Sequence, residues 1–389
     1  PDPWLSRPMR LAAGLTLPER RIGLAAHDFQ QGLGAAEVVL SRARRDAEAE
    51  TIPSRWLNRL VNLLAGLPEG QGPEALAAMR ARGQVWLDLA RRLARPALRL
   101  ERARRPAPIP PAPALHELSV TQVASLIRDP YAVYARRVLG LRPLDPLRPA
   151  PGPAERGMVL HRIMDRFLKG LPDLPETPAL MEARLLALAD EVLAAKVPWP
   201  SARLFWRARL AGIAPRLMAD EAERLTRGRP TVIEEPGRLK VPGWQFHLTA
   251  RPDRLDRLTD GRVHVYDYKS GRPPTDAQIR AFDKQLPLEA AMVEEGAFAR
   301  LGRAEVAGIS YIHLGGEGRT EPRELPPGLA AETWAGFQRL IGHYLRGERG
   351  FAARLAIEHT GEAGDYDHLS RYGEWDTTEA PQPRRFGDG

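Results

Sequence analysis

Two segments of alternating apolar and polar residues flank a short turn, and this pattern constrains the fold more than any other feature. Residues 246–258 and 262–269 alternate with a period of two, as β-strands do. The intervening Thr259-Asp260-Gly261 is typical of a hairpin turn. The sequence therefore predicts an antiparallel hairpin in the second half of the chain.

Two registers of this hairpin are open. With a two-residue loop, Arg262 pairs with Thr259, and the acidic residues Asp253 and Asp267 point to opposite faces. With a three-residue loop that ends in a left-handed glycine, Arg262 pairs with Leu258, and Asp253 lies opposite Asp267. We favour the second register.

Helical periodicity dominates the chain before the hairpin and returns after it. We expect helices at about 119–139, 155–169, 178–227, 275–295 and 328–347, with breaks at Asp129-Pro130, near Pro198 and at Pro215, and further strands at 231–234 and 305–314. This order predicts an α/β core with a mixed sheet flanked by helices.

The chain is expected to contain two domains and a linker. Residues 1–101 are rich in Leu, Ala and Arg at helical spacing, which predicts a mostly α-helical region. Residues 102–116 are proline-rich, and we interpret them as a linker because proline fixes φ and lacks an amide hydrogen. Residues 117–389 form the second domain. The chain begins without methionine, so we expect it to be part of a longer protein.

Composition narrows the classes of function. The absence of cysteine excludes disulfides, thiolate zinc sites, cysteine nucleophiles and cysteine-ligated iron–sulfur clusters. The net charge of +8 is compatible with nucleic-acid binding. Only five of the 57 basic residues are lysine, so a lysine inside a motif draws notice. No apolar run approaches the roughly 20 residues of a membrane helix, and we expect a soluble cytoplasmic protein without a membrane partner.

The favoured register places Asp253, Asp267 and Lys269 on one face of the hairpin. Two neighbouring carboxylates repel each other unless a cation lies between them, and hard oxygen ligands suit Mg²⁺ or Mn²⁺. An ammonium group beside the metal can orient water or neutralise charge on phosphorus. The alternative is a weak surface ion pair on a solvated strand.

These residues resemble a known family. Pro252-Asp253 followed by Asp267-Tyr268-Lys269 resembles the PD-(D/E)xK signature, and residues 250–256 and 265–271 are similar to its RecB-like branch. That branch also has a Gly-x-x-x-His helix before the sheet, which Gly157 and His161 match, and a later glutamine helix, which Gln285 matches.

The resemblance implies a restriction-endonuclease-like core and a Mg²⁺-dependent deoxyribonuclease, with Mn²⁺ as a substitute. The implied metal ligands are His161, Asp253, Asp267 and the carbonyl group of Tyr268, with Glu234 as a weaker candidate. The implied catalytic residues are Asp253, Asp267, Lys269 and Gln285.

Residues 1–101 resemble the end of the helicase-like region in AddAB-type helicase–nucleases. The resemblance implies a nuclease that acts on single DNA strands from an unwound duplex end, with an AddA-type helicase–nuclease subunit as partner. The N-terminal block has no Gly-x-x-x-x-Gly-Lys-[Ser/Thr] loop, so we assign it no ATPase activity. Two alternatives stay open, namely a catalytically silent DNA-binding scaffold and a free-standing recombination nuclease.

The sequence departs from the family pattern in two places. A tyrosine often follows the motif glutamine by four positions, but here Glu289 follows Gln285. Many relatives also carry an iron–sulfur cluster, for which this chain has no cysteine.

Two further features each have a second interpretation. His161 lies at the border of an apolar stripe and could be a packing residue, although we favour a metal ligand. Arg203, Arg207 and Arg209 with Trp206 could line a DNA channel, but we favour a solvated helix face with a core tryptophan.

Overall fold

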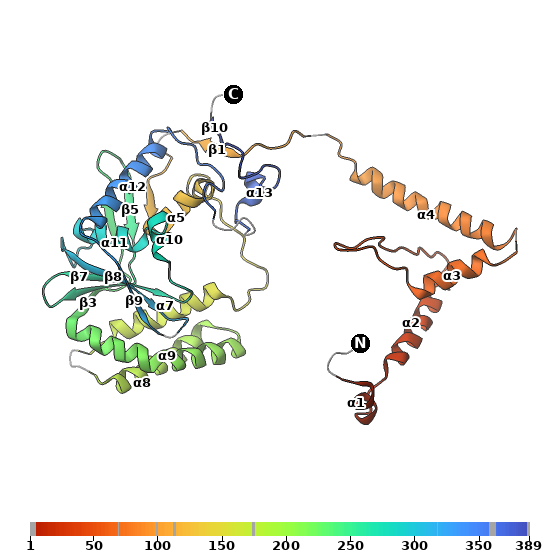
Figure 1. Ribbon diagram of the computed structural model, residues 1–389, viewed down its shortest axis with the longest axis horizontal. Helices are drawn as coiled ribbons and strands as arrows, with labels where there is room; N and C mark the ends of the chain where they lie inside the picture. Colours follow the sequence, from red (N-terminus) through yellow and green to blue (C-terminus); the bar gives the residue numbers. More distant parts are fainter. Residues whose placement is uncertain are drawn as a thin grey trace. The chain divides into compact units, whose positions relative to one another are not determined.

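The computed structural model describes residues 5–68, 70–98, 100–111, 114–172, 176–316, 318–357 and 363–386. The chain divides into two compact units, Pro1–Glu101 and Arg102–Gly389 (Figure 1).

The first unit is helical, as its periodicity predicts. It contains α1 (Arg7–Ala12), α2 (Pro18–Gly32), α3 (Arg55–Ala65) and α4 (Gly72–Ala94). The Ser54 side chain caps α3 by accepting a hydrogen bond from the amide of Leu57. Among the described residues of both units, none of the helices combines the length and the apolar character that a membrane-spanning segment requires.

The second unit is built on a five-stranded mixed sheet, which confirms the α/β prediction. Its strand order is β3 (Gly228–Val232), β6 (Arg254–Leu258), β7 (Val263–Lys269), β8 (Val306–His313) and β9 (Thr320–Arg323). β7 and β8 are parallel, and the other neighbours are antiparallel. A three-stranded sheet joins β2 (Glu117–Ser119), β5 (His247–Ala250) and β4 (Gly237–Lys240), and β1 (Pro106–Ile109) pairs with β10 (Gln382–Arg385).

Helices cover both faces of the five-stranded sheet (Figure 1). One face packs against α7 (Pro153–Lys169), α8 (Pro178–Lys196) and α9 (Pro200–Arg227). The other packs against α5 (Val120–Arg128), α11 (Gln285–Glu294) and α12 (Leu329–Leu345). The remaining elements are α6 (Pro130–Val133), the π-helical turn η1 (Tyr134–Val138), α10 (Asp276–Ala281) and α13 (Asp367–Ser370).

The hairpin between β6 and β7 has the favoured register. Arg254 pairs with Tyr266, and Arg257 pairs with Val263. One residue further along, the same register places Asp253 opposite Asp267. The amide of Leu258 donates to the carbonyl oxygen of Arg262 at 2.8 Å, so the loop has three residues. Gly261 ends this loop at φ +85°, a left-handed conformation that glycine adopts without steric cost.

Three expected elements are divided or extended. The strand expected over 246–258 is two strands in different sheets, separated by residues 251–253. The helix expected over 275–295 divides into α10 and α11. α9 continues through Pro215, where we expected a break, because Ala214 and Leu217 are fully buried and hold both halves against the core.

The proline-rich segment also differs from a free linker. Residues 106–109 form β1, and the buried Arg105 side chain donates to the carbonyl oxygens of Ala353 and Arg354. Proline is tolerated here because a two-stranded sheet has free edges, and Pro106 and Pro108 contribute carbonyl acceptors to the amides of Ala353 and Phe351.

Candidate active site

The β6–β7 hairpin presents different chemistry on its two faces. Asp253 and Asp267 belong to the face that carries Leu255 and Val265, which pack against α11 and its neighbours. The opposite face carries Arg254 and Tyr268 toward α9. The break between β5 and β6 leaves Asp253 just before the first paired residue of β6, at the end of the sheet.

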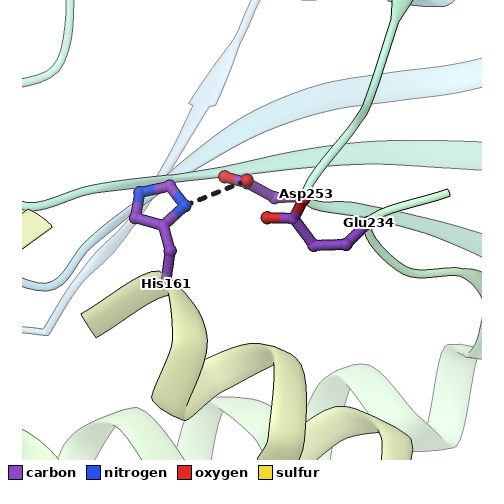
Figure 2. Close-up of side chains that lie close together, drawn as sticks. All are labelled: His161, Glu234 and Asp253. Atoms are coloured by element: carbon purple, nitrogen blue, oxygen red, sulfur yellow. Dashed lines mark hydrogen bonds and ion pairs between the residues drawn. The ribbon is translucent and has the colours of Figure 1, made fainter. Parts of the chain in front are cut away.

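Three side chains converge at this end of the sheet (Figure 2). His161 from α7, Glu234 after β3 and Asp253 each offer a ligand atom, and these atoms all lie within 4.8 Å of one another. His161 Nδ1 lies 3.0 Å from Asp253 Oδ1. The second oxygen of Asp253 accepts a hydrogen bond from the amide of Tyr268 at 2.7 Å. Asp253 is thus held between the helix and the neighbouring strand.

The backbone at Glu234 is strained in a way that brings its carboxylate to this group. Glu234 has φ +53°, in the left-handed region that costs about 1–2 kcal/mol for a residue with a side chain. Its amide donates to the carbonyl oxygen of Pro252, the residue before Asp253, at 3.0 Å. Arg251 forms an ion pair with its carboxylate at 3.1 Å. These contacts fix Glu234 beside Asp253.

Asp267 lies in an adjoining cluster with Lys269 and Gln285. Lys269 Nζ is 2.8 Å from Asp267 Oδ2, and Gln285 Nε2 donates to Asp267 Oδ1 at 2.6 Å. Lys269 Nζ also donates to Gln285 Oε1 at 3.2 Å. The three side chains therefore form a closed ring of polar contacts. Asp267 is buried, whereas 28% of the Lys269 side chain is exposed.

Gly157 lets α7 approach the loop after β7. A Cβ atom on Gly157 would lie 3.1 Å from the Ser270 hydroxyl oxygen, which is tighter than ordinary packing. Next to it, Arg156 donates to the carbonyl oxygen of Ser270 at 2.9 Å. This contact places His161, one turn further along α7, above the end of the hairpin.

The acidic groups repel one another in the absence of a cation. Burial and the charge of Asp253 raise the pKa of Asp267 to about 6, and the same two causes raise the pKa of Glu234. Burial opposes a charge on His161, but its hydrogen bond to Asp253 and the charge of Asp253 raise its pKa. Burial also opposes the Lys269 charge, but the neighbouring Asp267 raises the Lys269 pKa. A bound cation would relieve the repulsion.

The donor set suits a hard divalent cation. Among the residues that the structure describes, His161, Glu234 and Asp253 form the one group of three potential ligands that meets this spacing, and they provide two carboxylates and an imidazole. Carboxylate oxygens are typical ligands of Mg²⁺ and Mn²⁺, and imidazole is compatible with Mn²⁺. A metal therefore fits this site.

A cleft of about 780 Å³ opens beside the three ligands. His161 and Glu234 line it together with basic and aromatic residues, namely Arg162 of α7, Lys196 at the end of α8, Trp199 between α8 and α9, Trp206 of α9 and Arg251 after β5. A ligand in this cleft would contact His161 and Glu234 and also the cationic side chains of Arg162 and Lys196.

The predicted site residues thus occupy two adjoining clusters. His161 and Asp253 lie in the first, and Asp267, Lys269 and Gln285 lie in the second. The Tyr268 amide connects the clusters through Asp253. Glu234, the weaker candidate in the sequence, belongs to the first group, and Glu289 adjoins the second at 3.3 Å from Gln285 Nε2. In the sequence, Glu289 was noticeable because it stands four positions after Gln285, where the family often has a tyrosine.

The basic stretch of α9 has local partners in the folded unit. Arg207 pairs with Asp190 at 3.1 Å, Arg203 donates to the carbonyl oxygen of Val197, and Arg209 lies over the ring of Phe205. Trp206 is buried in the core between α7, α8 and α9, with one edge on the cleft. These contacts favour the interpretation as a helix face with a core tryptophan.

Metal binding should strengthen as the pH rises from 5 to 7.5. In the metal-free protein the pKa of Asp267 is raised, so folding favours its protonated form. Protonated Asp267 therefore contributes fully to the stability of the fold below the unfolded-state pKa, and this contribution is lost as the pH rises through about 6. A divalent cation bound by His161, Glu234 and Asp253 requires an ionised Glu234 and a neutral His161, and both groups have a raised pKa, so the cation would compete with protons. Its positive charge would also favour the ionised form of the adjoining Asp267. Each competing proton should weaken Mn²⁺ binding by roughly tenfold for each pH unit below the pKa of its group. We therefore expect Mn²⁺ at about 1 mM to raise the melting temperature, relative to EDTA, by more at pH 7.5 than at pH 5.

Thermal unfolding with Mn²⁺ or EDTA at the two pH values measures this difference. In the Asp267→Asn variant the amide cannot titrate, so the part of the pH dependence that comes from Asp267 should disappear, whereas His161 and Glu234 still titrate. An equal Mn²⁺ effect at both pH values in the unmodified protein would contradict the assignment.

Comparisons with known proteins agree with this geometry at the level of the family. The family model described as the PD-(D/E)XK nuclease superfamily matches residues 117–361. This range contains both clusters, the cleft and the whole five-stranded sheet.

The curated relatives are longer proteins. An uncharacterized protein of Rickettsia typhi is 26% identical over 205 residues, which cover 51% of this chain and 24% of the relative. One of Rickettsia conorii is 24% identical over 188 residues, covering 47% and 22%. The chain spans about a quarter of the length of these relatives. Among solved structures, the chain is similar to SSO0001 at 14% identity, covering 69% of this chain and 86% of that one, with a TM-score of 0.25.

Proposed function

The chain belongs to the PD-(D/E)XK nuclease superfamily, and from this premise we propose that its second unit is a metal-dependent deoxyribonuclease that hydrolyses phosphodiester bonds. The observation that carries the proposal is the meeting of His161, Glu234 and Asp253 within 4.8 Å beside the Asp267–Lys269 ion pair. Carboxylates grouped in this way suit a cation, and an adjacent ammonium group suits an anionic substrate.

Each residue has a task in this proposal. His161, Asp253 and Asp267 hold the metal, with Glu234 as a further ligand and, from the family resemblance, the Tyr268 carbonyl oxygen. A divalent cation bound there would activate a water molecule and stabilise negative charge on the phosphate. Lys269 orients the attacking water and offsets the charge that develops on phosphorus, and Gln285 holds Lys269 and Asp267 in place. The family resemblance implies products with a 5′-phosphate and a 3′-hydroxyl group.

The cleft suits a single strand of DNA. Arg162 and Lys196 can neutralise phosphates, whereas Arg251 is paired with Glu234, and the partly exposed Trp199 offers an aromatic face to an unpaired base. Bases in a duplex are stacked on each other and cannot use such a face. We therefore propose unwound single strands as the substrate.

We further propose that the chain is the C-terminal part of an AddB subunit of alphaproteobacterial type, with exonuclease activity during double-strand break repair. Its partner would be an AddA-type helicase–nuclease subunit. The stretches at 119–121, 128–136 and 365–369 support this proposal because they resemble AddB. In that arrangement, residues 1–101 are the end of the helicase-like region and 117–389 the nuclease domain. Co-purification of the chain with an AddA-type subunit tests the partnership, and a chain that acts without one would instead be a free-standing recombination nuclease.

A nuclease assay with a lysine variant tests the activity. The unmodified chain should degrade end-labelled single-stranded DNA with Mg²⁺ and leave it intact with EDTA. Lys269→Ala should lower the rate by about 10²–10³, since loss of one group that stabilises the transition state has an effect of this size. Lys240→Ala, an exposed lysine on β4, is the matched control and should leave the rate unchanged.

The same assay distinguishes an active nuclease from a catalytically silent DNA-binding scaffold. If the unmodified chain binds the DNA but leaves it intact with both Mg²⁺ and Mn²⁺, the unit is a silent DNA-binding scaffold and the proposed activity is wrong.

A further inference from the structure

Glu289 is a buried carboxyl group to which the proposed chemistry gives no task. It lies in α11, one turn after Gln285, and 1% of it is exposed. Its Oε1 atom lies 3.3 Å from Gln285 Nε2, and its Oε2 atom has no hydrogen-bond partner in the described part of the chain. A buried carboxyl group with incomplete hydrogen bonding destabilises a fold. An apolar residue would serve packing better at this position.

The Gln285 amide is the junction between Glu289 and the second cluster. Its NH₂ group donates to Asp267 Oδ1 at 2.6 Å and to Glu289 Oε1 at 3.3 Å. Its carbonyl oxygen accepts from Lys269 Nζ at 3.2 Å. Both amide hydrogens and the carbonyl oxygen are therefore used. A half-turn of the amide would point its oxygen at two carboxyl groups and its NH₂ group at an ammonium group.

Glu289 can accept this hydrogen bond as a neutral acid. Burial and the charges of Asp267 and Asp253 raise the Glu289 pKa well above its usual value. A protonated carboxyl group still has a carbonyl oxygen that accepts a hydrogen bond, and glutamine offers the same acceptor in nearly the same shape.

We propose that Glu289 is a positioning residue that fixes the Gln285 amide against Asp267 and Lys269. The inference rests on the proposed nuclease function, and it adds a residue that acts through Gln285 alone. Glu289 does not line the cleft, so it contributes to the rate of the chemical step and not to the binding of DNA.

Two substitutions of Glu289 separate this role from packing and from metal binding. Glu289→Gln keeps the acceptor and should retain at least half of the unmodified kcat. Glu289→Met keeps the length of the side chain but removes the acceptor, and should lower kcat about tenfold with KM unchanged, as loss of one hydrogen bond implies. In a Gln285→Met background, Glu289→Met should have less than about a twofold effect, because the two residues act as one unit.

Stability moves in the other direction. Glu289→Met removes a buried polar group with an unpartnered oxygen, so its melting temperature should equal or exceed that of the unmodified chain. Tyr344→Phe is the matched control: it also removes a buried oxygen without a partner in the described residues, but on α12, and should leave kcat unchanged.

A second measurement does not depend on nuclease activity. In the chain labelled with ¹⁵N-glutamine, the side-chain amide signal of Gln285 is identified by its loss in Gln285→Met. Its hydrogens should exchange with solvent slowly in the unmodified chain and in Glu289→Gln, and at least about tenfold faster in Glu289→Met, by the same hydrogen-bond reasoning.

The outcomes are distinguishable. If Glu289→Gln loses as much activity as Glu289→Met and needs more Mn²⁺, Glu289 acts as an anionic metal ligand, and the inference is wrong. It is also wrong if Glu289→Met leaves both kcat and the Gln285 amide exchange unchanged. If the unmodified chain cleaves no DNA, the proposed function fails, but the exchange measurement still decides the role of Glu289.

Discussion

Asp267→Asn is expected to lower the Mg²⁺-dependent cleavage of single-stranded DNA by at least about 10³-fold, since the metal contributes several kcal/mol to the transition state. The substitution keeps the shape of the side chain but removes its charge. It removes one carboxylate from the proposed metal site and the ion pair that holds Lys269 at 2.8 Å. The single substitution therefore weakens the binding of the metal and also removes the contact that positions the Lys269 ammonium group.

The hairpin offers a matched control for this variant. Asp260→Asn makes the same chemical change seven residues earlier, at an exposed turn position whose carboxylate contacts only Arg262 among the described ion pairs. It should retain the full rate. Rates at several Mg²⁺ concentrations, with circular dichroism to verify folding, complete the measurement. A folded Asp267→Asn variant within tenfold of the unmodified rate would contradict the catalytic assignment.

The sequence was sufficient to predict the hairpin because its register depends on local chemistry. Gly261 is the residue of the turn that adopts a left-handed conformation, which selects the three-residue loop and places Asp253 opposite Asp267. The alternative register would have put the two acids on opposite faces. Lys269 follows from the same periodicity, since it is two residues beyond Asp267 on the same strand.

Glu234 could not be placed from the sequence with the same clarity. Its position depends on a left-handed backbone conformation and on a hydrogen bond from its amide to Pro252, a residue 18 positions later. Non-local contacts of this kind leave no periodic signal. The break at residues 251–253 was missed for a related reason, because an alternating pattern continues across it while the chain leaves one sheet for another.

The proline-rich segment shows the limit of reading composition. Its prolines do exclude a central strand, as predicted, but they do not exclude an edge. β1 forms because Arg105 is buried against the carbonyl groups of residues 353 and 354, and β10 arrives from the far end of the chain. The partner segments lie more than 240 residues away, so the sequence near residue 106 contains no sign of them.

Arg254→Met is expected to have the largest effect on stability, a loss of about 3–5 kcal/mol in the free energy of unfolding, because it leaves buried charges without their partner. Arg254 is fully buried behind the hairpin. Its guanidinium group donates to both oxygens of Glu221, at 2.8 and 2.7 Å, and to both oxygens of Asp256, at 2.6 Å each. Arg224 also contacts Glu221 at 2.9 Å, but it cannot replace the bidentate pair that Arg254 forms with Asp256.

The loss should depend on pH in a defined direction. Burial opposes the charge of Glu221, but Arg254 and Arg224 lower its pKa to about 2. In the unmodified chain this carboxylate therefore contributes stability above its unfolded pKa near 4.5, and the contribution is lost as the pH falls toward 2. Without Arg254, Glu221 and Asp256 can take up protons at higher pH, and protonation removes the free-energy cost of burying their unpaired charges. The difference between variant and unmodified chain should thus be larger at pH 7.5 than at pH 4.5.

Urea unfolding at both pH values measures the difference, and Arg257→Met is the control on the same strand, since Arg257 is only partly buried and donates to the carbonyl oxygens of Gly261 and Leu301. A loss below about 1 kcal/mol, typical of an exposed pair, would contradict the argument.

Arg254 directly follows Asp253, and its side chain anchors the strand to α9 from the opposite face. The buried ion pairs therefore hold the backbone next to Asp253, whose carboxylate contacts His161 and the amide of Tyr268. The variant should thus bind Mn²⁺ more weakly even at temperatures where it stays folded.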